Sequence, residues 1–102
     1  MAKMNPAPVA YFEGAYVPVE EAKISIMTHA FNYGTGLFEG IRGYYNKEED
    51  RVLVFRLAEH VDRMVRNCRV LCMEVPETAD DIAEICCELV RRSGFKEDVY
   101  IR

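Results

Sequence analysis

The fifteen-residue segment from Thr28 to Arg42 restricts the regular structure of this chain more than any other feature. It combines aromatic residues and one histidine with three glycines, a glutamate and an arginine, and no regular periodicity runs through its first half. Glycine is frequent where a backbone turns tightly or approaches a ligand, and mixed aromatic and polar side chains are typical of a lined pocket. We therefore expect an irregular segment over 29–36, with one helical turn, that leads into a strand.

The composition is that of a small soluble domain. Half of the 102 residues are hydrophobic and 29% are charged, which allows one domain with a modest core. The 17 acidic and 13 basic residues are interspersed, so no nucleic-acid surface is predicted. No apolar run approaches the roughly 18 residues of a membrane helix, and residues 1–8 lack the apolar core of a signal peptide. We expect a cytoplasmic protein with no nucleic-acid and no membrane partner.

The cysteine pattern indicates a reduced protein. It contains no Cys-x-x-Cys pair and no histidine at the spacing of a zinc site. Two cysteines lie in one expected helix and a third lies on the apolar face of the next, so we interpret them as small core residues, and the fourth as partly exposed. No metal site is expected. The four are Cys68, Cys72, Cys86 and Cys87.

The expected elements follow the order hairpin, hairpin, two helices, strand. Alternating residues and turn signals predict a first hairpin around Glu13-Gly14 and a second around a polar loop. Apolar residues at helical spacing predict the two helices. The ranges are strands 9–12 and 15–19, an extended piece 24–26, strands 38–45 and 51–56, a helix over 58–73, a second helix between Thr78 and Gly94, and strand 98–102. This order fits an α+β domain, a small antiparallel sheet with two helices packed on one face.

Local signals define helix ends and strand faces. Thr78 stands three residues before Asp81, as in a capping box, and Gly94 is placed to end the second helix. Period-two geometry puts four residues of strand 38–45 on one face. They are Phe38, Gly40, Arg42 and Tyr44. By the same alternation, Tyr100 and Arg102 are expected on one face of strand 98–102. Arg42 is expected to pair with Glu39 or another carboxylate.

Five short motifs together resemble the N-terminal domain of the branched-chain amino acid aminotransferases, fold-type-IV enzymes that use pyridoxal 5′-phosphate. The resemblance covers essentially the whole chain. The residues of these motifs resemble the L-branched-chain group more than the D-amino-acid transaminases and aminodeoxychorismate lyases. The motifs are Tyr11-Phe12-Glu13-Gly14, His29 with Tyr33-Gly34-Thr35, Phe38-Glu39-Gly40-Ile41-Arg42, Phe55-Arg56-Leu57 through His60 and Arg63, and Tyr100-Ile101-Arg102.

The resemblance implies a cofactor site and a substrate site. Arg63 would contact the cofactor phosphate, since a guanidinium forms paired, charge-assisted bonds to phosphate. The implied substrate-binding residues are Tyr33, Phe38, Gly40, Tyr100 and Arg102. Phe38 would line an apolar pocket, Gly40 would leave room for substrate, and Arg102 would bind carboxylates. Tyr33 would reach the active site of a neighbouring subunit, which implies a homodimer or higher oligomer. His60 either positions Arg63 or is structural, and His29 is equally open.

The family members are much longer and carry their Schiff-base lysine beyond the matched region. None of Lys3, Lys23, Lys47 and Lys96 lies in an expected apolar pocket that would lower its pKa. We therefore interpret 1–102 as a single N-terminal domain without the cofactor-binding C-terminal domain. It is expected to be inactive alone, to contain no catalytic residue and not to bind pyridoxal 5′-phosphate stably.

The implied activity of the full-length enzyme is transfer of an amino group between leucine, isoleucine or valine and 2-oxoglutarate. Two alternatives remain open. The chain could be a non-catalytic dimerisation or scaffold fragment, or it could derive from a D-amino-acid transaminase or an aminodeoxychorismate lyase.

Overall fold

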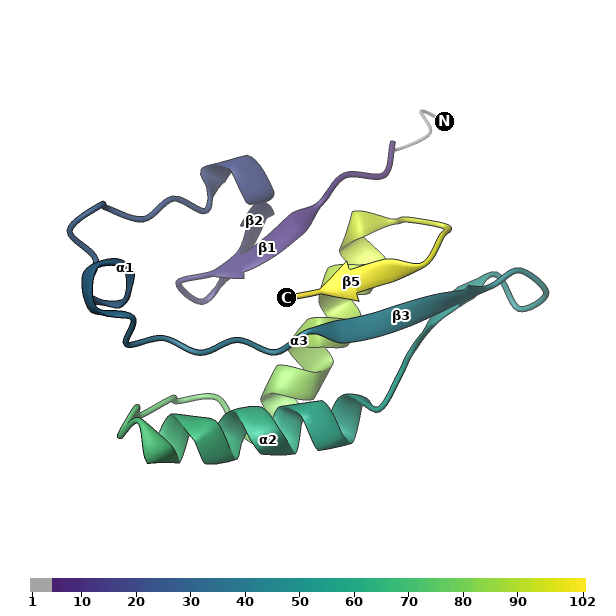
Figure 1. Cartoon of the computed structure of the whole chain (residues 1–102). Helices are drawn as coiled ribbons and strands as arrows, with labels where there is room; N and C mark the ends of the chain where they lie inside the picture. The colour runs from purple at the N-terminus through teal and green to yellow at the C-terminus, as the bar shows by residue number, and fades with distance from the viewer. Residues whose placement is uncertain (1–4) are drawn as a thin grey trace.

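Two antiparallel sheets and three α-helices make up the regular structure of residues 5–102, the part of the chain that the computed structural model describes (Figure 1). The fold is α+β, as the sequence predicts. The elements are β1 (Val9–Phe12), β2 (Ala15–Pro18), a short 3-10 helix η1 (Val19–Glu21), α1 (His29–Tyr33), β3 (Ile41–Asn46), β4 (Arg51–Val54), α2 (Leu57–Val70), α3 (Ala79–Ser93) and β5 (Val99–Ile101).

The first hairpin forms where the sequence predicts it. Strands β1 and β2 pair antiparallel from Val9 opposite Pro18 to Phe12 opposite Ala15. Glu13 and Gly14 have φ angles of 51° and 82°, and a two-residue turn with both φ angles positive matches the twist of paired strands. Pro18 is the last residue of its strand, where a missing N–H does least harm to the ladder.

The hairpin packs beside α3. The backbone N–H of Ala7 donates to the carbonyl of Ser93 (3.0 Å), and that of Val9 donates to the Ser93 hydroxyl (3.2 Å). The Arg92 guanidinium lies 4.2 Å from the centre of the Tyr16 ring. These contacts fix the hairpin at the C-terminal end of α3.

The second sheet has the strand order β4-β3-β5, with β3 antiparallel to both neighbours. The chain therefore forms two sheets rather than the one small sheet expected. β3 begins at Ile41 instead of Phe38, because no strand pairs with residues 38–40. The expected extended piece 24–26 is wrong: these residues lie in an irregular segment without a partner strand, and Ile24 and Ile26 are exposed.

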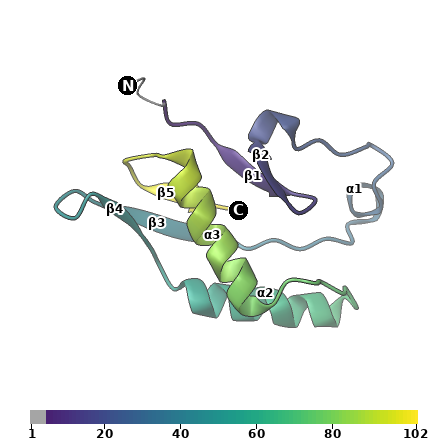
Figure 2. The same cartoon turned by 180° about the vertical axis from the view of Figure 1, so that it is seen from behind.

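The two faces of β3 differ sharply. Ile41 and Gly43 are buried, whereas Arg42 and Tyr44 are exposed. A Cβ at Gly43 would lie 2.6 Å from Val52 and 2.7 Å from Val99, so only glycine fits between the neighbouring strands. Helix α3 passes across one side of this sheet (Figure 2). The other side, which we call the open face, carries the exposed side chains of Arg42, Tyr44, Leu53, Phe55 and Tyr100.

The helix ends follow the local signals with one exception. The capping box at α3 is present: the Asp81 N–H donates to the Thr78 hydroxyl (3.1 Å), and the Thr78 N–H donates to the Asp81 carboxylate (2.9 Å). Gly94 ends α3 with a φ of 71°. Helix α2, however, ends at Val70 rather than near residue 73, because Cys72 adopts a left-handed φ of 55°.

The observed helix ends explain which cysteines are buried and which are exposed. Cys68 and Cys86 are buried in their helices and Cys87 is half-buried, as expected. Cys72 is exposed, which contradicts its expected place in the core, because it lies beyond the last turn of α2.

The apolar core is thin. The buried apolar side chains of residues 5–102 are those of Ile41, Val61, Cys68 and Cys86. The radius of gyration is 15.0 Å, larger than the roughly 13 Å typical of a compact domain of 100 residues. Much of the apolar surface of this chain is therefore open to contact.

Candidate functional site

A buried carboxylate organises the site. Glu39, two residues before the start of β3, is only 8% exposed and accepts hydrogen bonds from two residues of α2. Arg63 donates from Nε to Oε2 and from Nη2 to Oε1, both at 2.6 Å. The Nδ1 atom of His60 lies 2.8 Å from Oε1, so the proton on this ring nitrogen faces the carboxylate. We call Glu39, His60 and Arg63 the Glu39 cluster.

Electrostatics keep Glu39 and Arg63 ionised. The hydrogen bonds from Arg63, with a further contribution from His60, lower the pKa of Glu39 to about 2 against the opposing effect of burial. The same pair raises the pKa of Arg63. A buried carboxylate is stable only when it is paired and hydrogen-bonded, and here each carboxylate oxygen has a donor.

The Arg63 guanidinium is free on one edge. Its side chain is 56% exposed, and no hydrogen bond involves Nη1 within residues 5–102. Paired N–H groups in a fixed plane match the oxygens of a phosphate or carboxylate. The arrangement can therefore hold an anionic group while Glu39 holds the guanidinium, and the donor set fits a phosphate.

Four further predicted site residues lie close together, where β3 begins and β5 ends. The Arg102 guanidinium lies 4.4 Å from the centre of the Phe38 ring. The phenol of Tyr100 lies over Gly40, so that a Cβ there would come within 2.8 Å of the Tyr100 Cζ atom. Pairing of Arg42 with Tyr100 in the β3–β5 register produces both diagonal contacts. The sequence prediction placed these side chains on common strand faces, and the structure brings them together.

The structure gives a different reason for a glycine at position 40. The sequence prediction was that this glycine leaves room for substrate. In the structure, the space beside its Cα is taken by the Tyr100 phenol. Gly40 therefore first makes room for Tyr100, and any effect on substrate passes through the position of that ring.

Tyr33 lies apart from these residues. It ends the short helix α1, which lies away from β3 in both views (Figures 1 and 2), and the residue is 73% exposed. Its ring centre is 4.6 Å from that of His29, whose Nδ1 lies 2.7 Å from the Thr35 hydroxyl. His29 thus supports the local conformation of the segment. A role for Tyr33 in a neighbouring subunit stays a prediction.

The expected ion pair of Arg42 is wrong. Arg42 forms no ion pair in the described part of the chain, and its guanidinium lies 5.9 Å from the centre of the Tyr100 ring. Residues 39 and 42 lie on opposite sides of an extended chain, so Glu39 reaches α2 while Arg42 stays on the open face.

Sequence reasoning missed Glu39 as a site residue. The available signal was its alternation with exposed neighbours: Glu39 falls on the same side as the buried Ile41, and a buried charge requires a partner. His60 and Arg63, three residues apart on one helix face, offered that partner.

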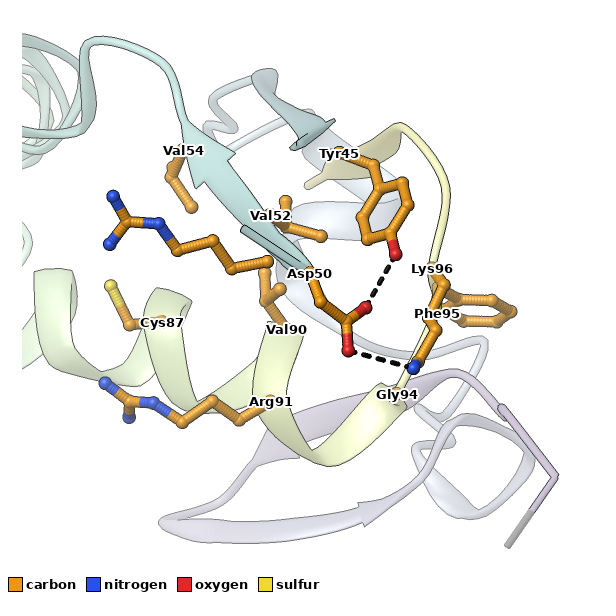
Figure 3. A pocket seen from close by; sticks show the side chains of 11 residues that line it. Tyr45, Asp50, Val52, Val54, Cys87, Val90, Arg91, Gly94, Phe95 and Lys96 are labelled. Atoms are coloured by element: carbon orange, nitrogen blue, oxygen red, sulfur yellow. Dashed lines mark hydrogen bonds and ion pairs between the residues drawn. The ribbon is translucent and has the colours of Figure 1, made fainter. Parts of the chain in front are cut away.

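A separate hollow of about 440 Å³ lies between β4 and the end of α3 (Figure 3). Asp50 accepts hydrogen bonds there from the Tyr45 hydroxyl (2.6 Å) and from Lys96 Nζ (3.1 Å). Arg91, also in its lining, pairs with Glu84 and Glu88. The charged groups of this hollow are engaged with protein partners, and none of the predicted site residues lines it.

The lysines of the described chain lie on the surface. Lys23, Lys47 and Lys96 are exposed, and the Asp50 carboxylate raises the pKa of Lys96, whereas a nucleophilic amine needs a lowered one. Lys3 lies outside the described residues. In residues 5–102, no three potential metal ligands gather in one place. Over the same residues, no helix has the length and apolar character that a bilayer span requires.

The chain belongs to the amino-transferase class IV family, whose model matches residues 36–102. Within that family it is similar to branched-chain aminotransferases. The probable branched-chain-amino-acid aminotransferase of Aquifex aeolicus is 53% identical over 93 residues, which cover 91% of this chain and 30% of that protein.

Solved structures agree with this placement. The branched-chain aminotransferase of the archaeon Thermoproteus uzoniensis, crystallised with norvaline, has a TM-score of 0.80 and 43% identity, over 86% of this chain and 29% of that one. The branched-chain amino acid aminotransferase of Thermobaculum terrenum in its PLP form has a TM-score of 0.76 and 34% identity, over 84% and 28%. The chain thus spans about a third of the length of the relatives that it matches.

Proposed function

We propose that this chain is the N-terminal domain of a branched-chain amino acid transaminase that exchanges amino groups between leucine, isoleucine or valine and 2-oxoglutarate. The observation that carries the proposal is the Arg63 guanidinium, oriented by Glu39 and open on its Nη1 edge. A relative crystallised in its PLP form supports a phosphate as the anion at this edge.

In this proposal each site residue has a distinct task. Arg63 binds the phosphate of pyridoxal 5′-phosphate, which when bound supplies an electron sink for the exchange of the amino group. Phe38 and Tyr100 form the apolar wall for a branched side chain. Arg102 binds the substrate carboxylate, and its stacking on Phe38 limits its movement. Tyr33 serves the neighbouring subunit of a homodimer or higher oligomer.

We further propose that the 102 residues alone are inactive and do not hold the cofactor stably. The exposed lysines of the described chain support this, because none has the desolvated setting that favours a neutral amine. Addition of pyridoxal 5′-phosphate should give no lysine adduct in the absorption spectrum. A stable adduct at one lysine would contradict this part of the proposal.

A chimera tests the activity directly. This chain replaces the segment that it matches in the Aquifex aeolicus relative, and the unmodified relative is assayed in parallel. We expect the chimera to transaminate L-leucine with 2-oxoglutarate and to leave D-alanine unchanged. Arg63→Ala should weaken the affinity of the chimera for pyridoxal 5′-phosphate, measured by equilibrium dialysis.

Other results would change the assignment. Preference of the chimera for D-alanine would favour a D-amino-acid transaminase, and release of product without an acceptor 2-oxo acid would favour a lyase. A folded, cofactor-binding chimera with no activity, beside an active parent, would contradict the proposal.

The second candidate is a non-catalytic dimerisation module. The exposed apolar side chains of the open face favour it, since a surface of this kind is typical of an interface. An inactive chimera together with a stable dimer of this chain would support this candidate.

A further inference from the structure

Glu39 is the one charged side chain that is buried within residues 5–102, and it joins two distant parts of the chain. It precedes β3, whereas its partners His60 and Arg63 lie 21 and 24 residues later on α2. Burial of a carboxylate is costly, and an apolar residue of similar size would suit a core this thin. Packing alone therefore does not explain a charged side chain at this position.

The contacts show what Glu39 does to Arg63. Bonds on Nε and Nη2 define the plane of the guanidinium and its rotation about the long axis of the side chain. A long arginine side chain without such bonds samples many rotamers. The bonded edge faces the protein, so the Nη1 edge is the one left for a ligand.

His60 in turn restrains Glu39. Its Nδ1 atom bonds Oε1, the oxygen that also accepts from Arg63 Nη2. Rotation of the carboxylate would break both contacts at once. His60 is itself mostly buried, so its ring keeps one orientation toward Glu39.

We propose that Glu39 and His60 are positioning residues, which hold the Arg63 guanidinium so that its Nη1 edge binds a phosphate group. This inference rests on the proposed function, in which Arg63 contacts the cofactor phosphate. Neither Glu39 nor His60 touches the phosphate in this arrangement.

Charge and position predict opposite effects of neutralising Glu39. The carboxylate repels a phosphate by simple Coulomb interaction, so its removal would strengthen phosphate binding if charge alone mattered. If Glu39 acts by holding the guanidinium, its removal weakens binding, because the donors must first be ordered. The sign of the change therefore separates the two roles.

The experiment uses the chimera described above, in which this chain replaces the matched segment of the Aquifex aeolicus relative, with ¹⁵N-labelled arginine side chains. Pyridoxamine 5′-phosphate is the probe, because it carries no aldehyde to react with lysines, and pyridoxamine is the phosphate-free comparison at the same ionic strength. The variants are Glu39→Gln, His60→Ala and His60→Asn, whose amide can still donate to Oε1. The matched control is Glu59→Gln. Glu59 lies on α2, as His60 and Arg63 do, and the substitution removes the exposed partner of Arg56.

We expect the Arg63 signals to respond to pyridoxamine 5′-phosphate and not to pyridoxamine. Glu39→Gln should weaken the affinity about tenfold, by analogy with the loss of metal affinity when the hydrogen-bonding partner of a metal ligand is removed, and should speed hydrogen exchange at Nε. His60→Ala should have a smaller effect that His60→Asn reverses. Glu59→Gln should change neither quantity.

The outcomes separate this inference from the proposed function. If Arg63→Ala abolishes binding and Glu39→Gln leaves it unchanged or tighter, the positioning role is overturned and the phosphate contact stands. If Arg63→Ala leaves binding unchanged, the phosphate contact falls and the inference with it. If Arg63 of the unsubstituted chimera gives no response, the inference is overturned and the transamination assay alone judges the function.

Glu39→Gln could prevent folding, which loss of signal dispersion would reveal. The two His60 variants then decide, since they keep the Arg63–Glu39 pair. Equal phosphate affinity of the His60→Ala, His60→Asn and unsubstituted chimeras would overturn the inference.

Discussion

A single carboxylate links the stability of this chain to its proposed chemistry. Glu39 is ionised at neutral pH because Arg63 and His60 donate to it, and Arg63 keeps a free edge because Glu39 occupies the other. The residues of the open face, by contrast, make contacts that are diagonal and exposed. The Glu39 cluster, which hydrogen bonds hold in place, and the exposed residues of the open face thus lie on opposite sides of the same extended segment.

This carboxylate should make stability depend on acid pH. The pKa of Glu39 is about 2 in the folded chain and near 4.5 when unfolded, so the unfolded chain binds more protons in between. Stability from this group is therefore complete above about pH 5 and is lost as pH falls toward 2. We expect a loss of about 2 kcal/mol, reduced from the full linkage value because half of Arg63 lies in water.

Urea unfolding at pH 7 and pH 3 measures this effect. Asp50, Asp81 and Glu88 also have lowered pKa values, so the comparison is made against Glu39→Gln, which keeps those three groups. The difference in unfolding free energy between the two proteins should shrink between pH 7 and pH 3. A difference that is the same at both pH values would show that ionisation of Glu39 contributes nothing.

At the scale of elements, the three-stranded sheet depends on one glycine. Gly43 lies in the central strand β3 between Val52 of β4 and Val99 of β5. An added methyl would force these strands apart on the side that faces the helices. Gly43→Ala should therefore destabilise the chain by about 1–3 kcal/mol, the usual cost of overpacking.

Gly36→Ala is the matched control for this substitution. Gly36 has no left-handed φ, and an added Cβ would meet only the Ala30 side chain at 3.4 Å, an ordinary contact. Its unfolding midpoint in urea should remain close to that of the unsubstituted chain. Equal midpoints for the two alanine variants would show that the sheet adjusts to a Cβ at Gly43.

Local rules account for the elements that could be predicted from the sequence. The turn at Glu13-Gly14, the capping box at Thr78 and the end of α3 at Gly94 each depend on residues that are adjacent in sequence. The early end of α2 at Val70 is a local error, whereas two other errors concern partners that are distant in sequence. Residues 24–26 alternate like a strand but have nothing to pair with, and Glu39 takes its partners from a helix rather than from Arg42.

The same distinction applies to the site. Period-two geometry was enough to place Phe38 and Gly40, or Tyr100 and Arg102, on common faces. It could not show that the Tyr100 phenol fills the space beside Gly40, because that contact depends on the register between β3 and β5. Register is set by pairing across the whole sheet, which no single motif encodes.

At the scale of the whole molecule, more of the described apolar side chains are exposed than buried. The described chain buries few apolar side chains, while Tyr44, Leu53, Phe55 and Tyr100 lie exposed together on the open face. Tyr44 and Phe55 are in edge contact, with ring centres 6.1 Å apart. A contiguous surface of this kind is favourable to bury, at about 25 cal/mol per Å² of apolar area.

We therefore expect the isolated chain to associate through the open face. Sedimentation at increasing protein concentration should show a reversible rise in mass, and Phe55→Glu should suppress it by placing a charge within the contact. Val70→Glu is the control, because Val70 is equally apolar and more exposed but lies at the end of α2, away from the sheet. If both substitutions suppress association equally, exposed apolar side chains in general cause the association, and the open face is not a specific interface. If neither does, the interface lies elsewhere, and the exposed segment that carries Ile26, Phe31 and Tyr33 becomes the next surface to substitute.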